Sequence, residues 1–145
     1  MPEDRFFVTN QPLEESARDI ERGVVRNLEE LNRFVTGTLE AAMALVVYPR
    51  SYQYSMRESP GNWEAHLYEV LGPYVREPFN FFEKSRGWMP FPVLNLLPAF
   101  EATDEYPLFL EDDPHWNAAG ARFVAEAVAQ WAVGAGLVPC QADSR

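Results

Sequence analysis

The sequence predicts an α/β fold, in which helices alternate with the strands of a layered sheet. Residues 13–42 carry apolar side chains at spacings of three and four, with charged residues between them, which is the pattern of an amphipathic helix. Residues 43–48 follow directly as a continuous apolar run, as expected for a parallel strand that is covered on both faces. Helix and strand patterns then continue in turn to the C-terminal helix, so we expect a single domain over residues 1–145.

The N-terminal half is predicted as an extended segment, a long helix, a strand and a loop. The extended segment covers residues 5–9, an apolar run. The apolar face of the helix over residues 13–42 consists of Ile20, Val24, Leu28, Leu31, Val35 and Leu39. Pro49 ends the strand, and residues 50–62 are polar and contain a Pro-Gly pair, which predicts a loop at the carboxyl end of the strand.

The C-terminal half is predicted as two short helices, a second strand and a final helix. The helices cover residues 63–71 and 77–84, separated by Gly72-Pro73, and the strand covers residues 91–97. A helical turn over 97–102 and an extended segment over 106–110 lead to the final helix over 118–133, which ends at Gly134 and Gly136. We expect that helix to pack through Ala121, Val124, Ala125, Val128 and Trp131.

Composition supports a folded protein and argues against several kinds of partner. With 47% hydrophobic and 14% aromatic residues, 145 residues are enough to build a core. The net charge of −10 and the scattered basic residues argue against binding to nucleic acid or to an anionic membrane. No apolar stretch is long enough to span a membrane, and the acidic start is unlike a signal peptide. The composition leaves the compartment open.

The chemistry available to the side chains is also restricted. The single cysteine, Cys140, excludes an intramolecular disulfide. Two histidines and this remote cysteine make a zinc or iron site an unfavourable interpretation, and no cofactor is predicted.

The most informative stretch is residues 111–120, where acidic side chains precede a histidine at the start of a helix. Pro114 disfavours helical geometry at Asp113, and Asn117 is a good N-cap for the final helix, so His115 is expected on the loop before it. A loop allows a carboxylate to fold back onto the imidazole ring. Such a pair fixes the tautomer of the ring and leaves the second nitrogen free to deprotonate a hydroxyl group.

This stretch resembles the last sequence block of the SGNH or GDSL esterases and acyltransferases, in its Asp-x-His-Trp-Asn-x-x-Gly variant. Residues 44–55, Ala-Leu-Val-Val-Tyr-Pro-Arg and onward, look like a late strand and loop of the same family. The resemblance implies a three-layer, flavodoxin-like fold and a serine-dependent ester hydrolase or O-acyl transferase. It implies His115 as general base and Asp113 as the residue that orients it. Asp112 is the alternative, because many family members use the position three before the histidine.

The family's nucleophile lies in a Gly-Asp-Ser block near the N-terminus, and this sequence contains no such block. We therefore interpret the chain as the C-terminal portion of the fold, with its nucleophile upstream of Met1. In that case a strand edge is left uncovered, and we expect the chain either to self-associate through that edge or to be poorly stable alone. The alternative interpretation is a non-catalytic module that kept the fold and lost the nucleophile.

Side chains after the first strand are candidates for substrate contact. Arg50, Tyr52 and Gln53 follow that strand at the edge where ligands bind in open α/β sheets, so they are candidates to bind a small-molecule or carbohydrate ester. The alternative is a purely structural role for these three residues, in which they clamp the loop. Ser51 and Ser55 are nearby hydroxyls, and we expect them to be solvated loop residues rather than nucleophiles of a self-contained hydrolase.

Overall fold

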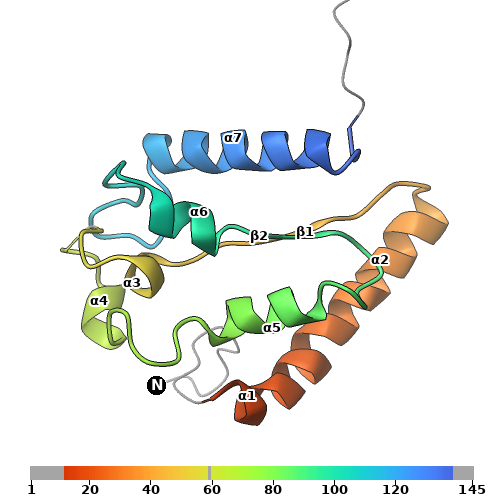
Figure 1. The fold of residues 1–145 in the computed structure, drawn as a ribbon, viewed down its shortest axis with the longest axis horizontal. Coiled ribbons are helices and arrows are strands. Elements are labelled where there is room, and N and C mark those ends of the chain that lie inside the picture. The colour runs from red at the N-terminus through yellow and green to blue at the C-terminus, as the bar shows by residue number, and fades with distance from the viewer. Residues whose placement is uncertain (1–11, 59, 139–145) are drawn as a thin grey trace, which may run out of the picture.

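The computed structural model describes residues 12–58 and 60–138. At its centre lies a parallel pair of strands, β1 (Leu45–Val47) and β2 (Val93–Asn95), with Leu45 opposite Val93. Helix α7 covers one face of this pair, and α1 and α5 lie on the other, so the molecule has three layers (Figure 1). The predicted α/β class is confirmed. The predicted extended segment over 5–9 and Cys140 lie outside the described residues.

One long helix leads into the sheet. It consists of α1 (Leu13–Ile20), a π-helical segment η1 (Glu21–Val25) and α2 (Arg26–Thr38), which follow one another without a break. The helix ends four residues earlier than residue 42. Glu40 adopts a positive φ of 51°, and the amide of Ala41 donates to the Val35 carbonyl at 3.2 Å, which is a C-terminal capping arrangement that stops the helix.

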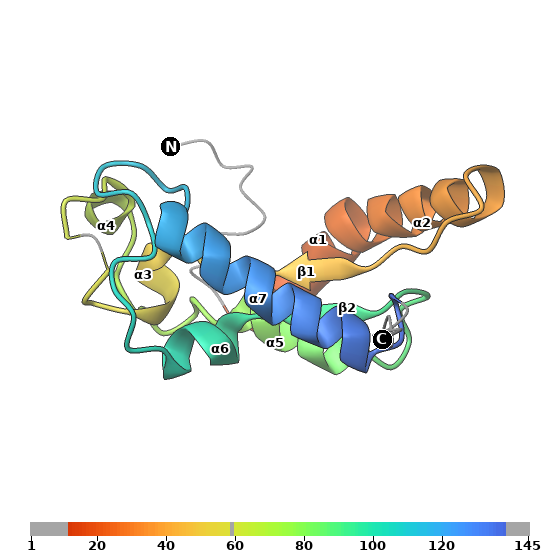
Figure 2. The same cartoon turned by 90° about the horizontal axis from the view of Figure 1, so that it is seen from above.

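The apolar face of this helix is buried in its first half only. Ile20 and Val25 are each 2% exposed, whereas Leu31 and Leu39, which lie on the predicted apolar face, are 48% and 57% exposed. The π-helical segment adds one residue to a turn, which brings Val25 rather than Val24 fully inward. The second half of the helix extends beyond the sheet and meets no covering element (Figure 2).

Of the remaining helices, α3 and α4 differ from the sequence prediction, and α5, α6 and α7 match it. The segment over 50–62, predicted as a loop, begins with a short helix α3 (Ser51–Tyr54), because the Gln53 side chain accepts a hydrogen bond from the Arg50 amide at 2.9 Å. Helix α4 (Glu64–Leu67) is shorter than the predicted 63–71, and the chain turns at Leu71 with a φ of 54°. Helices α5 (Glu77–Ser85), α6 (Leu97–Ala102) and α7 (Ala118–Gly134) match the expectation closely.

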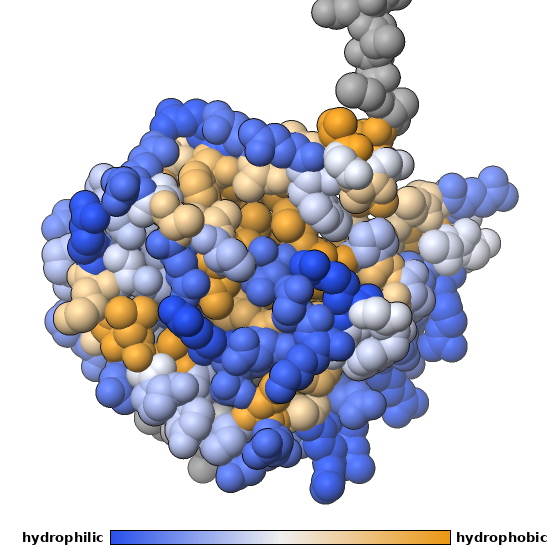
Figure 3. Space-filling model, viewed as in Figure 1, coloured by the Kyte–Doolittle hydropathy of each residue, from blue (hydrophilic) through white to orange (hydrophobic). Residues whose placement is uncertain are grey.

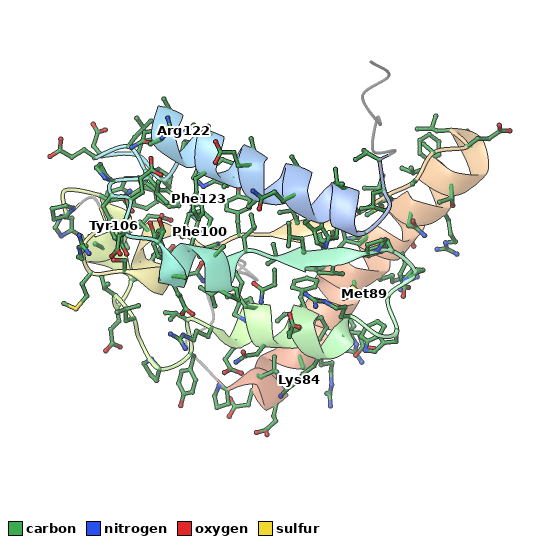
Figure 4. All side chains as sticks on the ribbon, turned by 45° about the horizontal axis from the view of Figure 1, so that its top comes forward. Lys84, Met89, Phe100, Tyr106, Arg122 and Phe123 are labelled. Carbon is green, nitrogen blue, oxygen red and sulfur yellow. The ribbon has the colours of Figure 1, made fainter. Side chains whose placement is uncertain are left out.

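Two hydrophobic clusters fill the space on either side of the sheet. Under α7, Phe123 meets Phe100 of α6 edge-on, with ring centroids 5.0 Å apart (Figure 4). Val124 is buried, but Ala121 and Ala125 are exposed, so the inward face of α7 runs through the larger side chains at 123 and 124. Met89, Phe81 and Phe82 belong to the cluster on the opposite face. Within the described residues, no helix has the length and apolar character needed to cross a membrane.

A buried carboxylate ties the segment before α7 into the core. Glu58, 4% exposed, accepts hydrogen bonds from the amides of Leu108 and Phe109 at 2.9 and 3.0 Å, and from the hydroxyl of Tyr54. Burial, with the hydrogen bond to Glu58, raises the pKa of Tyr54 far above its usual value, so the phenol stays neutral and keeps donating. The segment over 106–110 is thereby held in the extended form that the sequence predicts.

The first turn of α7 lies so close to this segment that Gly120→Ala is expected to destabilise the protein. A Cβ at Gly120 falls 2.0 Å from the Leu108 carbonyl oxygen, a backbone atom that cannot swing aside. We expect a cost of about 1–3 kcal/mol, seen as a fall in Tm of several degrees by circular dichroism. Gly134→Ala is the matched control, because nothing lies within 4 Å there. An unchanged Tm for Gly120→Ala contradicts this packing.

Candidate active site

The candidate site lies at the carboxyl ends of the two strands. Both strands run toward α3 and α6, and the chain between α6 and α7 returns across this end (Figures 1 and 2). In that return, Phe109 and Trp116 form an antiparallel bridge, and the Leu110 amide donates to the His115 carbonyl at 2.9 Å. Residues 111–115 therefore form a loop that is closed at its base.

Asn117 joins this loop to the helix behind it. Its side-chain oxygen accepts from the Gly120 amide at 2.9 Å, which makes it the N-cap of α7 as predicted. Its amide nitrogen donates to the carbonyls of Pro107 and Phe109, at 2.7 and 3.2 Å. One side chain therefore fixes both the start of α7 and the strand that precedes the loop.

At the tip of the loop, Asp113 and His115 contact each other. One oxygen of Asp113, Oδ1, accepts from the backbone amide of His115 at 2.8 Å and is hydrogen-bonded to the ring nitrogen Nδ1. The His115 side chain is 80% exposed. Nδ1 is thus occupied by the carboxylate, and the other ring nitrogen, Nε2, is accessible from outside. Trp116 packs against Tyr48, with ring centroids 4.5 Å apart.

The electrostatics of the pair favour an ionised carboxylate. The hydrogen bonds from the His115 ring and backbone hold the pKa of Asp113 below its usual range, and the charge of Arg50 lowers it further. Because the folded-state pKa is depressed, this stabilisation is present above the unfolded value of about 3.9 and is lost as pH falls through the folded-state pKa. The carboxylate is therefore charged at neutral pH and suited to orient the ring.

Three further polar side chains, Arg50, Asn62 and Glu64, lie next to the loop that carries the Asp113–His115 pair. The guanidinium of Arg50 binds the carboxylate of Glu64 through two contacts, Nε to Oε2 at 3.0 Å and Nη2 to Oε1 at 2.7 Å. The Glu64 side chain is 3% exposed. Asn62, fully buried, donates through Nδ2 to the Asp113 carbonyl at 3.0 Å and accepts from the Glu64 amide at 2.9 Å. These contacts connect the segment after α3 to the loop that carries Asp113.

The other predicted site residues are not hydrogen-bonded to the His115 ring. Asp112 is exposed, and the ring of His115 bonds to Asp113 rather than to it. Tyr52 and Gln53 are 3% and 4% exposed, and the Gln53 amide nitrogen donates to the Val75 carbonyl at 3.2 Å. Of the three predicted substrate-binding side chains, Arg50 alone keeps substantial exposure, at 37%. Substrate contact by any of the three stays a prediction.

The two nearby serines are buried rather than solvated, contrary to expectation. Ser51 is 2% exposed and begins α3, and Ser55 is 8% exposed, with its hydroxyl accepting from the Arg57 amide at 3.0 Å. In the part of the chain that the structure describes, no serine hydroxyl is hydrogen-bonded to the His115 ring. The same part holds no group of three or more His, Cys, Asp or Glu residues placed to bind a metal ion.

Three residues of this region carry no clear signal in the sequence. Asn62 follows a Pro-Gly pair and reads as a turn residue, and Glu58 and Glu64 read as ordinary surface acids. Nothing local in the sequence marks a carboxylate that will be buried against a segment 50 residues away. An Asn directly after a turn is the single signal present, because Asn side chains often bond to backbone groups.

Comparison with known proteins finds a similarity for part of the chain. Residues 84–138 match a family model described as an SGNH hydrolase-like domain, acetyltransferase AlgX. The matched part runs from the end of α5 through β2, α6 and the Asp113 loop to the end of α7. No curated protein and no solved structure matches the chain.

Proposed function

Because residues 84–138 match the model of an SGNH hydrolase-like domain, we propose that this chain supplies the Asp–His part of a serine-dependent site for acyl transfer or ester hydrolysis. The observation that carries the proposal is the contact between Asp113 and Nδ1 of His115, on an exposed loop at the carboxyl ends of parallel strands. Ligand sites in open α/β sheets lie at this edge. The contact also falls within the matched residues.

In the proposed mechanism, Nε2 of His115 takes the proton of a serine hydroxyl as the oxygen attacks the acyl carbonyl. Asp113 accepts the Nδ1 proton in a hydrogen bond and stabilises the imidazolium that forms. The imidazolium then returns its proton to the leaving oxygen, and the acyl group stays on the serine until water or an alcohol removes it. The serine and the oxyanion-hole donors are supplied from outside these 145 residues.

The substrate class proposed is an ester or an O-acyl group, including acyl groups carried on carbohydrate. The description of the matched family as an acetyltransferase supports acyl transfer. We further propose that residues 1–145 form a single, partial domain of this fold.

A second candidate function is a non-catalytic module derived from the same fold. The absence of a Gly-Asp-Ser block from the 145-residue sequence favours it. The coding sequence upstream of Met1 separates the two candidates. A Gly-Asp-Ser block after an apolar strand there supports the enzyme, whereas a stop codon directly upstream supports the module.

We also propose that the chain self-associates through its sheet. Among the described residues, β1 and β2 pair only with each other, so each strand has one unpaired edge. Unpaired strand edges readily pair with a further strand. Apolar surface is visible in the middle of the face shown in Figure 3, between polar side chains. Size-exclusion chromatography with light scattering is expected to show a dimer or larger species, and a monomer at all concentrations contradicts the proposal.

The 145-residue chain by itself is expected to show negligible esterase activity. A general base without its nucleophile and oxyanion donors lacks the parts that act as a unit. The measurement is turnover of a short-chain activated ester, with His115→Ala and Ser51→Ala as controls. Turnover well above buffer that disappears in both variants contradicts the expectation and supports a self-contained hydrolase that uses Ser51.

A further inference from the structure

Asn62 is the side chain that connects the Asp113 loop to the body of the protein. Its side chain is 0% exposed, and the nitrogen and the oxygen of its amide group form hydrogen bonds to two different segments. The Nδ2 group donates to the Asp113 carbonyl, and Oδ1 accepts from the Glu64 amide two residues further on. A buried amide that satisfies groups on both sides is costly to replace, because either partner is left unpaired.

The loop needs such an anchor because its own side chains give it little packing. The side chains of Asp113 and His115 are 44% and 80% exposed. Pro114 follows Asp113 and has no backbone N–H to donate. The backbone bridge holds the base of the loop, between Leu110 and His115, but not its tip.

The neighbouring glycine shows how closely the two segments approach. A Cβ at Gly61 would lie 3.3 Å from Cγ of Glu111 and 3.7 Å from its carbonyl oxygen. Residues 61 and 62 are therefore in contact with both sides of the loop tip, at residues 111 and 113. This close contact is independent of the hydrogen bond that Asn62 makes.

The ion pair between Arg50 and Glu64 fixes the other end of the connection. Glu64 is nearly fully buried, and a buried carboxylate is stabilised when a cation satisfies it through two hydrogen bonds. The amide of Glu64 is the group that Asn62 accepts from. The same pair holds the guanidinium of Arg50 close enough to Asp113 to favour its ionised form.

We propose that Asn62 is a positioning residue for the Asp113–His115 pair, and that the Arg50–Glu64 ion pair holds Asn62 in place. Its catalytic meaning rests on the proposed function. Asn62 fixes the backbone of Asp113, and Asp113 in turn orients the ring of His115. Misplacing a catalytic group by about 1 Å is enough to cost on the order of 100-fold in rate, so a residue that touches no substrate still controls the site.

The test compares Asn62→Ala with Asn95→Ala by NMR titration of the Asp113 carboxyl carbon in the 145-residue protein. The two asparagines are matched, since Asn95 Oδ1 also accepts from an amide two residues on, that of Leu97 at 3.0 Å. Asn62→Ala is expected to raise the pKa of Asp113 toward the value in His115→Ala, because the carboxylate no longer stays on its donors. Asn95→Ala is expected to leave the Asp113 pKa at the wild-type value.

Asn62→Ser guards against a variant that fails to fold. Serine keeps an oxygen that can accept from the Glu64 amide and removes the donor to Asp113. The same rise in the Asp113 pKa is expected in this variant. An Asp113 pKa equal to wild type in Asn62→Ser, or shifted equally in Asn95→Ala, overturns the positioning role. Neither result depends on ester turnover, so failure of the positioning role is distinguishable from failure of the proposed function.

Discussion

The buried Glu58 carboxylate determines where the chain before the last helix can lie. Its hydrogen bonds to the amides of Leu108 and Phe109 fix an extended segment inside the core. That segment bonds to Asn117 and forms the bridge with Trp116, and these contacts close the loop that carries Asp113 and His115. Glycine at 120 is the condition for this arrangement, because the Leu108 carbonyl occupies the space of a side chain. The site therefore depends on a carboxyl side chain that lies in the core and takes no part in the proposed chemistry.

The geometry of the pair combines local and distant restraints. Locally, one oxygen of Asp113 accepts from both the backbone and the ring of His115, a contact that the Asp-Pro-His spacing makes possible. From a distance, Asn62 fixes the Asp113 backbone, and Arg50 supports the charge of the carboxylate. The local turn brings the two partners within reach of each other, and the distant contacts hold the loop so that the carboxylate stays on its donors.

The elements that were predicted from the sequence are those whose signals are local. The apolar run before Pro49, the cap at Asn117 and the periodic helices α5 and α7 each carry their cause within a few residues. The pairing of Asp113 with His115 belongs to the same class. Its proposed role came from the family resemblance, which the match over residues 84–138 supports at the level of the domain.

The features that escaped prediction are those decided by contacts distant in sequence. Helix α3 forms in a polar stretch because Gln53 caps it and points on to Val75. Leu31 and Leu39 fit the helical period but extend past the sheet, where no described element covers them. The burial of Glu58 and Asn62 follows from the path of the segments around residues 108 and 113, which periodicity does not encode.

The tautomer of His115 tests the central claim most directly. Two-dimensional ¹⁵N NMR of the 145-residue protein, above the pH at which the ring is protonated, distinguishes a ring nitrogen that carries hydrogen from one that does not. The account predicts hydrogen on Nδ1, donated to Asp113, and a bare Nε2 that is able to accept a proton. A ring with hydrogen mainly on Nε2, as in free histidine, or an even mixture of the two tautomers, would show that Asp113 does not orient it.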